Sequence, residues 1–198
     1  MSNFPETAEE FLSGQIFLID KPLGWTSFDL VKKVKNLIRT KYNLKKIKVG
    51  HAGTLDPLAT GLLIVCTGKF TKRISEVQGQ AKIYTGEITL GGTTPSYDLE
   101  TEVDARYEIS HITKRLIQDT ILQFTGEIDQ KPPIFSALKR GGERLYEKAR
   151  RGENIEIEAR KINIHSFGIT AIEMPIISFE IMCGKGTYIR SIAHDFGI

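Results

Sequence analysis

Residues 50–65 have the sequence GHAGTLDPLATGLLIV, in which a loop containing glycine and proline runs directly into an apolar segment. The apolar residues 62–66 predict a short buried strand. The loop carries Asp56 directly before Pro57, and a proline holds the residue that precedes it in an extended conformation. This stretch therefore predicts an acidic side chain that is presented on a loop and anchored by a buried strand.

The segments on either side mix helix and strand patterns without a strict β-α-β alternation. Apolar residues recur at helical spacing after Thr26 and Ser27, and either hydroxyl is suited to cap that helix. We expect strands over residues 15–20, 62–66, 82–90, 153–173 and 176–183, and helices over 28–38, 110–124, 143–151 and from about 187. This arrangement predicts an α+β fold with a mixed, largely antiparallel sheet flanked by helices.

Length and composition are typical of a soluble globular protein, with 198 residues of which 40% are hydrophobic and 26% charged. We expect a polar N-terminal tail over residues 1–13 and one domain over residues 14–198. Cys66 and Cys183 are far apart, which argues against a disulfide framework and a zinc site. The absence of a signal-peptide pattern and of an 18-residue apolar run predicts a cytoplasmic protein.

Asp56 is the first candidate for chemistry, because a carboxylate on an exposed loop can act as a nucleophile, a base or a metal ligand. The alternative is a turn aspartate that hydrogen-bonds its own backbone, which is the commoner role of an isolated Asp-Pro pair. His51 lies five residues earlier but fits no metal-ligand spacing, and by itself it is more typical of a structural or surface histidine.

Residues 184–190, GKGTYIR, form a second candidate site. The two glycines permit a close approach of the backbone, and the helix that follows favours an anion at its N-terminus. Arg190 is suited to pair with a carboxylate and Tyr188 to stack or hydrogen-bond, although a plain strand-to-helix turn with a surface arginine fits the same pattern. Tyr84, in an alternating strand, is equally compatible with packing.

A basic segment covers residues 32–48, which contain eight Lys or Arg and no acidic residue, although the net charge of the whole chain is only +3. A charge run is usually a solvated face, but this density predicts contacts with a phosphate backbone. We assign that role to Lys32, Lys35, Lys45, Lys46 and Lys48. No P-loop, dinucleotide-binding or zinc-protease motif is present, so we expect no cofactor and no metal.

Five segments of the chain, in this order, resemble the motifs of the bacterial tRNA pseudouridine synthase B family. They are residues 18–35 (LIDKPLGWTSFDLVKKVK), 50–65, 82–91 (KIYTGEITLG), 130–152 (QKPPIFSALKRGGERLYEKARRG) and 183–197 (CGKGTYIRSIAHDFG). The resemblance implies the pseudouridine synthase catalytic fold and the isomerisation of uridine 55 in the T-loop of tRNA, without a cofactor. It also implies that the partner is the T-arm of tRNA, that no membrane is involved, and that the protein is a monomer.

The resemblance also implies roles for individual residues. Asp56 matches the nucleophile, Tyr84 the tyrosine that packs on the target uracil, and Arg190 the arginine that pairs with the aspartate. The remaining matches are a second pocket tyrosine, the histidine that fills the space left by the flipped base, and a lysine near the active site, which are Tyr188, His51 and Lys21. The resemblance thus implies that these three residues bind the substrate. Three routes of glycosidic cleavage stay open, namely attack at C1′, attack at C6, and removal of a ribose proton to give a glycal.

Two departures from the family pattern are visible. Pro95 lies in a loop that contacts RNA in the family, and Asp98 is retained in that loop. Family members continue beyond the equivalent of Ile198 with an apolar active-site leucine and often an RNA-binding domain. From this we expect a truncated chain with little activity. Two other hypotheses are a non-catalytic tRNA-binding module or folding chaperone, and a hydrolase that uses Asp56 and His51, for which no second catalytic carboxylate is evident.

Overall fold

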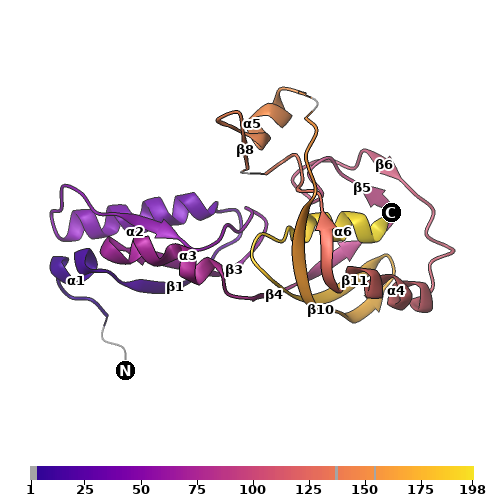
Figure 1. Cartoon of the computed structure of the whole chain (residues 1–198), viewed down its shortest axis with the longest axis horizontal. Coiled ribbons are helices and arrows are strands. Elements are labelled where there is room, and N and C mark those ends of the chain that lie inside the picture. Colours follow the sequence, from indigo (N-terminus) through magenta and orange to yellow (C-terminus); the bar gives the residue numbers. More distant parts are fainter. Residues whose placement is uncertain (1–3, 137, 154) are drawn as a thin grey trace. The chain divides into compact units, whose positions relative to one another are not determined.

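The computed structural model describes residues 4–136, 138–153 and 155–198. The chain divides into two compact units, residues 1–80 and residues 81–198 (Figure 1). The sequence predicted a single domain over residues 14–198 and gave no sign of this division. Each unit is described by itself below.

Unit 1 is built around a three-stranded antiparallel sheet with the order β1-β3-β2. The apolar run at residues 62–66 forms the central strand, as its sequence predicted. The elements of this unit are α1 (Ala8–Ser13), β1 (Ile16–Lys21), α2 (Ser27–Lys41), β2 (Val49–His51), β3 (Gly61–Thr67), the 3₁₀ helix η1 (Gly68–Arg73) and α3 (Ile74–Gln78).

Helix α2 begins where the sequence predicted, because Thr26 caps it in a reciprocal pair of bonds with Asp29. Its Leu30 packs against Leu63 and Val65 of β3, and these three side chains are buried. Phe28 and Leu37 of the same helix are 69% and 58% exposed, so they lie outside its buried face.

The prediction of a polar tail over residues 1–13 is wrong for its second half. Thr7 and Glu10 form a capping box that starts α1, and Phe11 is buried with Ile38 and Ile47. A Thr-x-x-Glu spacing is a helix start signal that the acidic composition of this segment concealed. Thr67 also donates a hydrogen bond to the Phe11 carbonyl, which fixes α1 to the end of β3.

Unit 2 contains a four-stranded sheet with the order β4-β11-β10-β7, in which neighbouring strands are antiparallel. Together the two sheets confirm the α+β class and the largely antiparallel pairing. The elements are β4 (Lys82–Thr89), β5 (Gly92–Thr93), β6 (Ala105–Arg106), α4 (Lys114–Ile121), η2 (Leu122–Phe124), β7 (Gly126–Gln130), β8 (Lys139–Arg140), β9 (Glu143–Arg144), α5 (Leu145–Arg150), β10 (Arg160–Glu173), β11 (Ile176–Cys183) and α6 (Ile189–Gly197).

The core of unit 2 lies where α4 and α6 pack on this sheet. Ile117 from α4 and Ile192 from α6 join a cluster of buried residues from β4, β10 and β11. Aromatic rings fill the remaining space, and Phe196 of α6 lies 5.6 Å from the Phe167 ring. This packing fixes the start of α6, which carries Arg190 and is preceded by Tyr188. Among the described residues, no helix is long and apolar enough to cross a membrane.

Candidate functional site

The Asp56 loop joins β2 to β3 in unit 1 and is attached to the start of α2. The Ser27 hydroxyl accepts a hydrogen bond from the Leu55 amide at 2.9 Å and donates one to the Leu55 carbonyl at 3.1 Å. Ser27 is only 2% exposed, so water competes little for these bonds. The backbone directly before the half-buried Asp56 is therefore fixed in place.

Lys21 supports the same loop from the end of β1. Its side chain is fully buried, and its ammonium group donates to the carbonyls of Trp25 at 2.6 Å, Pro22 at 3.1 Å and Pro57 at 3.4 Å. Burial lowers the pKa of Lys21, and the negative charge of Asp56 opposes that shift. Three carbonyls match the three donors of an ammonium group, so Lys21 binds the loop backbone from within the unit.

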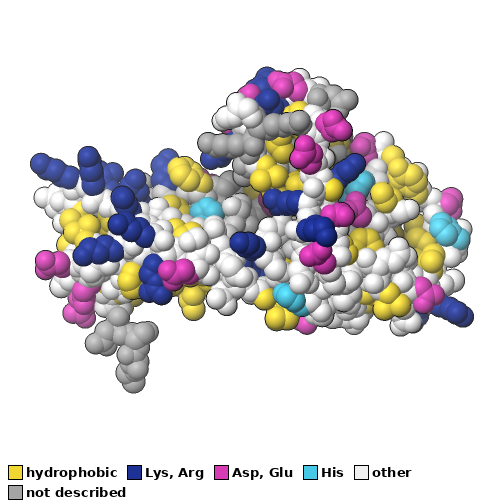
Figure 2. Space-filling model, viewed as in Figure 1, with side chains coloured by type: hydrophobic (Ala, Val, Ile, Leu, Met, Phe, Trp, Pro, Cys, Tyr) yellow, Lys and Arg dark blue, Asp and Glu magenta, His cyan; other side chains and the backbone are white. Residues whose placement is uncertain are grey.

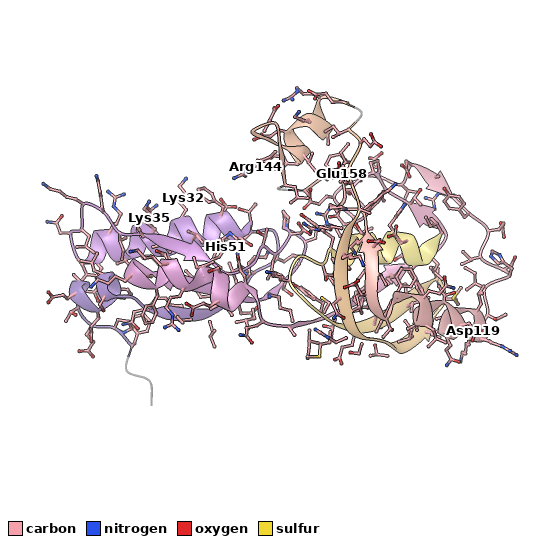
Figure 3. The ribbon with its side chains drawn as sticks, viewed as in Figure 1. Lys32, Lys35, His51, Asp119, Arg144 and Glu158 are labelled. Carbon is pink, nitrogen blue, oxygen red and sulfur yellow. The ribbon has the colours of Figure 1, made fainter. Side chains whose placement is uncertain are left out.

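His51 ends β2 and lies half-buried beside the loop (Figure 3). Its Nδ1 lies 2.6 Å from the carbonyl oxygen of Gly53. Because a carbonyl only accepts, Nδ1 is the donor in this contact. The contact orients the imidazole against its own loop.

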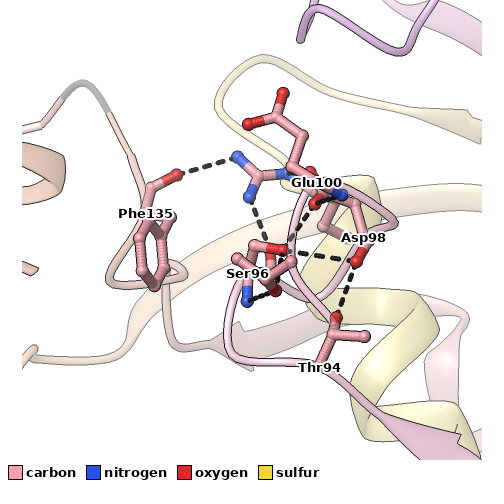
Figure 4. A network of polar contacts seen from close by, with 7 residues as sticks. Thr94, Ser96, Asp98, Glu100 and Phe135 are labelled. Atoms are coloured by element: carbon pink, nitrogen blue, oxygen red, sulfur yellow. Dashed lines mark hydrogen bonds and ion pairs between the residues drawn. The ribbon is translucent and has the colours of Figure 1, made fainter. Parts of the chain in front are cut away.

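The described contacts of Arg190, at the start of α6 in unit 2, include acceptors on Ser96, Asp98 and Phe135, which Figure 4 labels. Its guanidinium donates to the Ser96 carbonyl at 2.7 Å and the Phe135 carbonyl at 3.0 Å, and lies 3.5 Å from the Asp98 carboxylate. The side chains of Arg190 and Asp98 are only 13% and 15% exposed. Screening by solvent is weak at such exposure, so the ion pair and both hydrogen bonds act together to fix the guanidinium.

The loop over residues 94–101 is itself held together by short polar contacts. The Asp98 carboxylate accepts from the Ser96 hydroxyl at 2.6 Å and from the Glu100 amide at 2.9 Å, which orients it toward Arg190. Tyr97 adopts a positive φ of 61° and stacks on His194 of α6, with ring centroids 3.8 Å apart. The loop is thus attached to α6 at two points.

Tyr188 precedes α6 and is held by the buried Gln130 at the end of β7. The Gln130 amide donates to the Tyr188 carbonyl at 3.0 Å and accepts from the Tyr188 amide at 2.8 Å. The Arg160 guanidinium lies 4.9 Å from the centre of the Tyr188 ring, a cation–π contact. Both the backbone and the ring of Tyr188 are therefore oriented.

Tyr84 lies on the outer strand β4, opposite Ile181 of β11. It is half-buried and packs against the core of unit 2. The expected strand position is confirmed, and the half-exposed ring is compatible with both packing and contact with a ligand.

The structure brings the predicted residues together in two groups. Lys21, His51 and Asp56 surround one loop of unit 1, whereas Tyr84, Tyr188 and Arg190 belong to unit 2. The ion pair between Asp56 and Arg190, two residues that belong to different units, stays a prediction. No sequence pattern predicted that Ser27 anchors the Asp56 loop or that Gln130 holds Tyr188, since an isolated hydroxyl or amide carries no spacing signal.

The predicted RNA-contacting lysines are all exposed on unit 1. Lys32 and Lys35 lie on α2 (Figure 3). The other three, Lys45, Lys46 and Lys48, lie on the segment between α2 and β2. Lys and Arg side chains gather over this unit in the space-filling view (Figure 2). Across the described part of the chain, no group of three or more His, Cys, Asp or Glu is arranged to hold a metal ion.

A family model described as TruB family pseudouridylate synthase (N terminal domain) matches residues 39–189. The tRNA pseudouridine synthase B of Flavobacterium johnsoniae is 65% identical over 192 residues, which cover 96% of this chain and 84% of that protein. The protein of the same name from Parabacteroides distasonis is 50% identical over 188 residues, covering 95% and 80%.

Two solved structures share the fold. A chain of a Cbf5-Nop10-Gar1 complex superposes with a TM-score of 0.68 at 27% identity, over 97% of this chain and 46% of that one. A chain of an H/ACA RNP bound to a substrate RNA containing 2′-deoxyuridine superposes with a TM-score of 0.65 at 24% identity, over 97% and 44%. The chain thus spans less than half of these larger proteins.

Proposed function

The chain belongs to the TruB family of pseudouridylate synthases, and on that premise we propose that it converts uridine 55 in the T-loop of tRNA to pseudouridine with Asp56 as the nucleophile. Its curated relatives are named tRNA pseudouridine synthase B, so the chain is an isomerase that forms pseudouridine in tRNA. The observation that carries the finer proposal is the Asp56 loop, whose backbone is fixed by Ser27 on one side and by Lys21 on the other.

The reaction is an isomerisation that needs neither a cofactor nor an energy source. The N1–C1′ bond breaks, C5 bonds to C1′, C5 loses a proton and N1 gains one, so atoms and electrons balance. Attack at C1′, attack at C6 and formation of a glycal all require an ionised carboxylate. A nearby guanidinium favours the charged form of a carboxylate, and this is the role that we assign to Arg190.

The target uridine must leave its stack to reach Asp56, which costs a few kcal/mol that contacts in the pocket offset. We assign Tyr84 to the face of the flipped uracil and Tyr188 to the same pocket. His51 fills the space that the base vacates. The support for these roles is that each ring is half-buried and that Tyr188 and His51 are oriented by their own contacts.

Lys21 acts on the loop rather than on the substrate. The family resemblance implied a role for Lys21 in substrate binding, but a fully buried ammonium group that donates to three carbonyls is committed to the backbone. We therefore assign Lys21 as a positioning residue for Asp56.

The T-arm of tRNA is the proposed partner, and the protein acts on it as a monomer in the cytoplasm. The exposed lysines at positions 32, 35, 45, 46 and 48 are assigned to its phosphates, because Lys binds phosphate as a mobile point charge.

The test is to mix the protein with unmodified T-arm RNA and to measure pseudouridine by mass spectrometry after selective chemical labelling. We expect product with uridine at position 55 and none when cytidine replaces it. Tight binding without product from the uridine substrate would favour a non-catalytic RNA-binding module instead.

A further inference from the structure

Helix α6 presents two different faces to the rest of unit 2. Ile192 and Phe196 lie on one face and are buried in the core. Arg190 and His194, which are also four residues apart, lie on another face, because residues at this spacing follow one another along one side of a helix. Both side chains contact the loop over residues 94–101, so this loop lies along that second face.

Three consecutive residues of the loop make these contacts in alternation. The Arg190 guanidinium donates to the Ser96 carbonyl at 2.7 Å and lies 3.5 Å from the Asp98 carboxylate (Figure 4). Between these two acceptors, the Tyr97 ring stacks on the His194 ring, with centroids 3.8 Å apart and planes inclined by 10°. The stack therefore holds the residue that links the two acceptors of Arg190.

The backbone of Tyr97 adopts a conformation that its side chain does not favour. Its φ of 61° lies in the left-handed region, which a residue with a bulky side chain rarely adopts. Such a conformation persists only where the surrounding structure holds it. With this φ, the Ser96 carbonyl on one side of Tyr97 and the Asp98 carboxylate on the other reach the same guanidinium. Loss of the stack would free Tyr97 to return to an ordinary φ and would move both acceptors away from Arg190.

The two rings are suited to hold this conformation. Both are half-buried, and burial raises the pKa of Tyr97, to which the negative charges of Asp195 and Asp104 add. The phenol therefore stays uncharged at neutral pH. An aromatic pair changes an equilibrium by about threefold to tenfold beyond the effect of its buried area, which is enough to favour one loop conformation.

We propose that Tyr97 and His194 are positioning residues for Arg190, which hold the loop that orients its guanidinium without contacting the substrate themselves. The proposal rests on the proposed function for the role of Arg190 as the partner of Asp56. It goes beyond that function, because it assigns a part in catalysis to two residues through their effect on a third.

The test compares the wild-type protein with His194→Ala, which removes one ring of the stack and leaves the loop sequence unchanged. The single-turnover rate is measured at saturating T-arm RNA, and the dissociation constant is measured separately. We expect a rate decrease of about threefold to tenfold with an unchanged dissociation constant. His194→Phe retains a ring that can stack and restores the rate. The matched control is His111→Ala, at an exposed position before α4, which retains the wild-type rate.

The guanidinium itself is followed by NMR, independently of the reaction. The Nε–H cross-peak of Arg190 is identified by its absence from the spectrum of Arg190→Lys. Because this Nε lies 3.5 Å from the Asp98 carboxylate, we expect slow exchange of its proton with water in the wild type. In His194→Ala the cross-peak shifts and its proton exchanges faster, whereas His194→Phe and His111→Ala give the wild-type signal.

Tyr97→Gly separates the ring from the backbone turn, because glycine adopts a positive φ without strain but cannot stack. We expect the same loss of rate and the same NMR change as in His194→Ala. Melting curves show whether each variant is folded, and Tyr97→Gly supplies the comparison if His194→Ala is not.

Two results would overturn the proposal. One is a wild-type rate and a wild-type Arg190 cross-peak in His194→Ala or Tyr97→Gly, since the turn would then hold without the stack. The other is weaker RNA binding at an unchanged saturating rate, which would make the pair an RNA contact. If the wild-type protein forms no product from any RNA, the proposed function fails, while the Arg190 cross-peak still decides whether the stack positions the guanidinium.

Discussion

Asp56 in unit 1 and Arg190 in unit 2 are fixed in different ways. In unit 1, Ser27 and Lys21 hold the backbone on either side of Asp56, over sequence separations of 28 and 36 residues. In unit 2, the guanidinium group itself is held, by carbonyls 94 and 55 residues away and by Asp98. The described anchors of the Asp56 loop thus act on its backbone, whereas a change near Arg190 alters the network that positions its charge.

Of these substitutions, Asp56→Asn should lower activity the most, because it removes the charge of Asp56 while it keeps the size of the side chain. Asparagine retains the shape and hydrogen-bonding capacity of the side chain but cannot act as the anionic nucleophile. We expect single-turnover product to fall below detection while the melting temperature stays the same. Activity within about tenfold of wild type, equivalent to about 1.4 kcal/mol of barrier, would contradict the assignment.

Tyr84→Phe tests whether unit 2 contributes more than a surface for stacking. The phenyl ring still covers the uracil, but it lacks the hydroxyl group that we assign to removal of the C5 proton. Loss of a general base costs about 10²–10⁴-fold, so we expect that decrease in single-turnover rate with an unchanged dissociation constant for T-arm RNA. A normal single-turnover rate would show that the Tyr84 hydroxyl does not remove the C5 proton and that the residue contributes only packing.

Asp98→Asn tests whether the contacts that hold Arg190 affect catalysis, because it weakens one of them without removing the guanidinium. A hydrogen bond to a charged group contributes about 1.5–3 kcal/mol, so we expect a rate decrease of about tenfold to a hundredfold. The loss should appear in the single-turnover rate at saturating RNA rather than in RNA affinity. The matched control is Asp119→Asn on α4, whose partner Arg115 is 91% exposed, and we expect no change there.

The sequence predicted the parts of this molecule that depend on local patterns. The cap at Thr26, the central strand over Gly61–Thr67 and the alternating strand that carries Tyr84 follow from spacing alone. The helix α1 was missed because its core contribution is a single residue, Phe11, in an otherwise polar segment.

Long-range contacts could not be predicted in the same way. The clamp of Gln130 on Tyr188 joins residues 58 positions apart, and no periodicity relates them. The basic segment was visible in the sequence, but the close approach of Gly68 at the start of η1 to the backbone of Leu12 in α1 was not. Residue types thus indicate which chemistry is present, whereas packing decides which groups face each other.

The smallest expected effect is that of Lys21→Met, which tests the support of the Asp56 loop through stability. Methionine approximates the length of the side chain but leaves the carbonyls of Trp25 and Pro57 without their charged donor. The lost bonds and the removed cost of burying a charge oppose each other, so we expect a net destabilisation of about 1–3 kcal/mol.

Trp25 is the single tryptophan of the chain, so its fluorescence during urea unfolding reports on unit 1 alone. We expect a lower urea midpoint for Lys21→Met and an unchanged one for the exposed-position control Lys33→Met. If both variants unfold at the wild-type midpoint, the three carbonyl contacts of Lys21 do not stabilise the loop, and its role in positioning Asp56 is refuted.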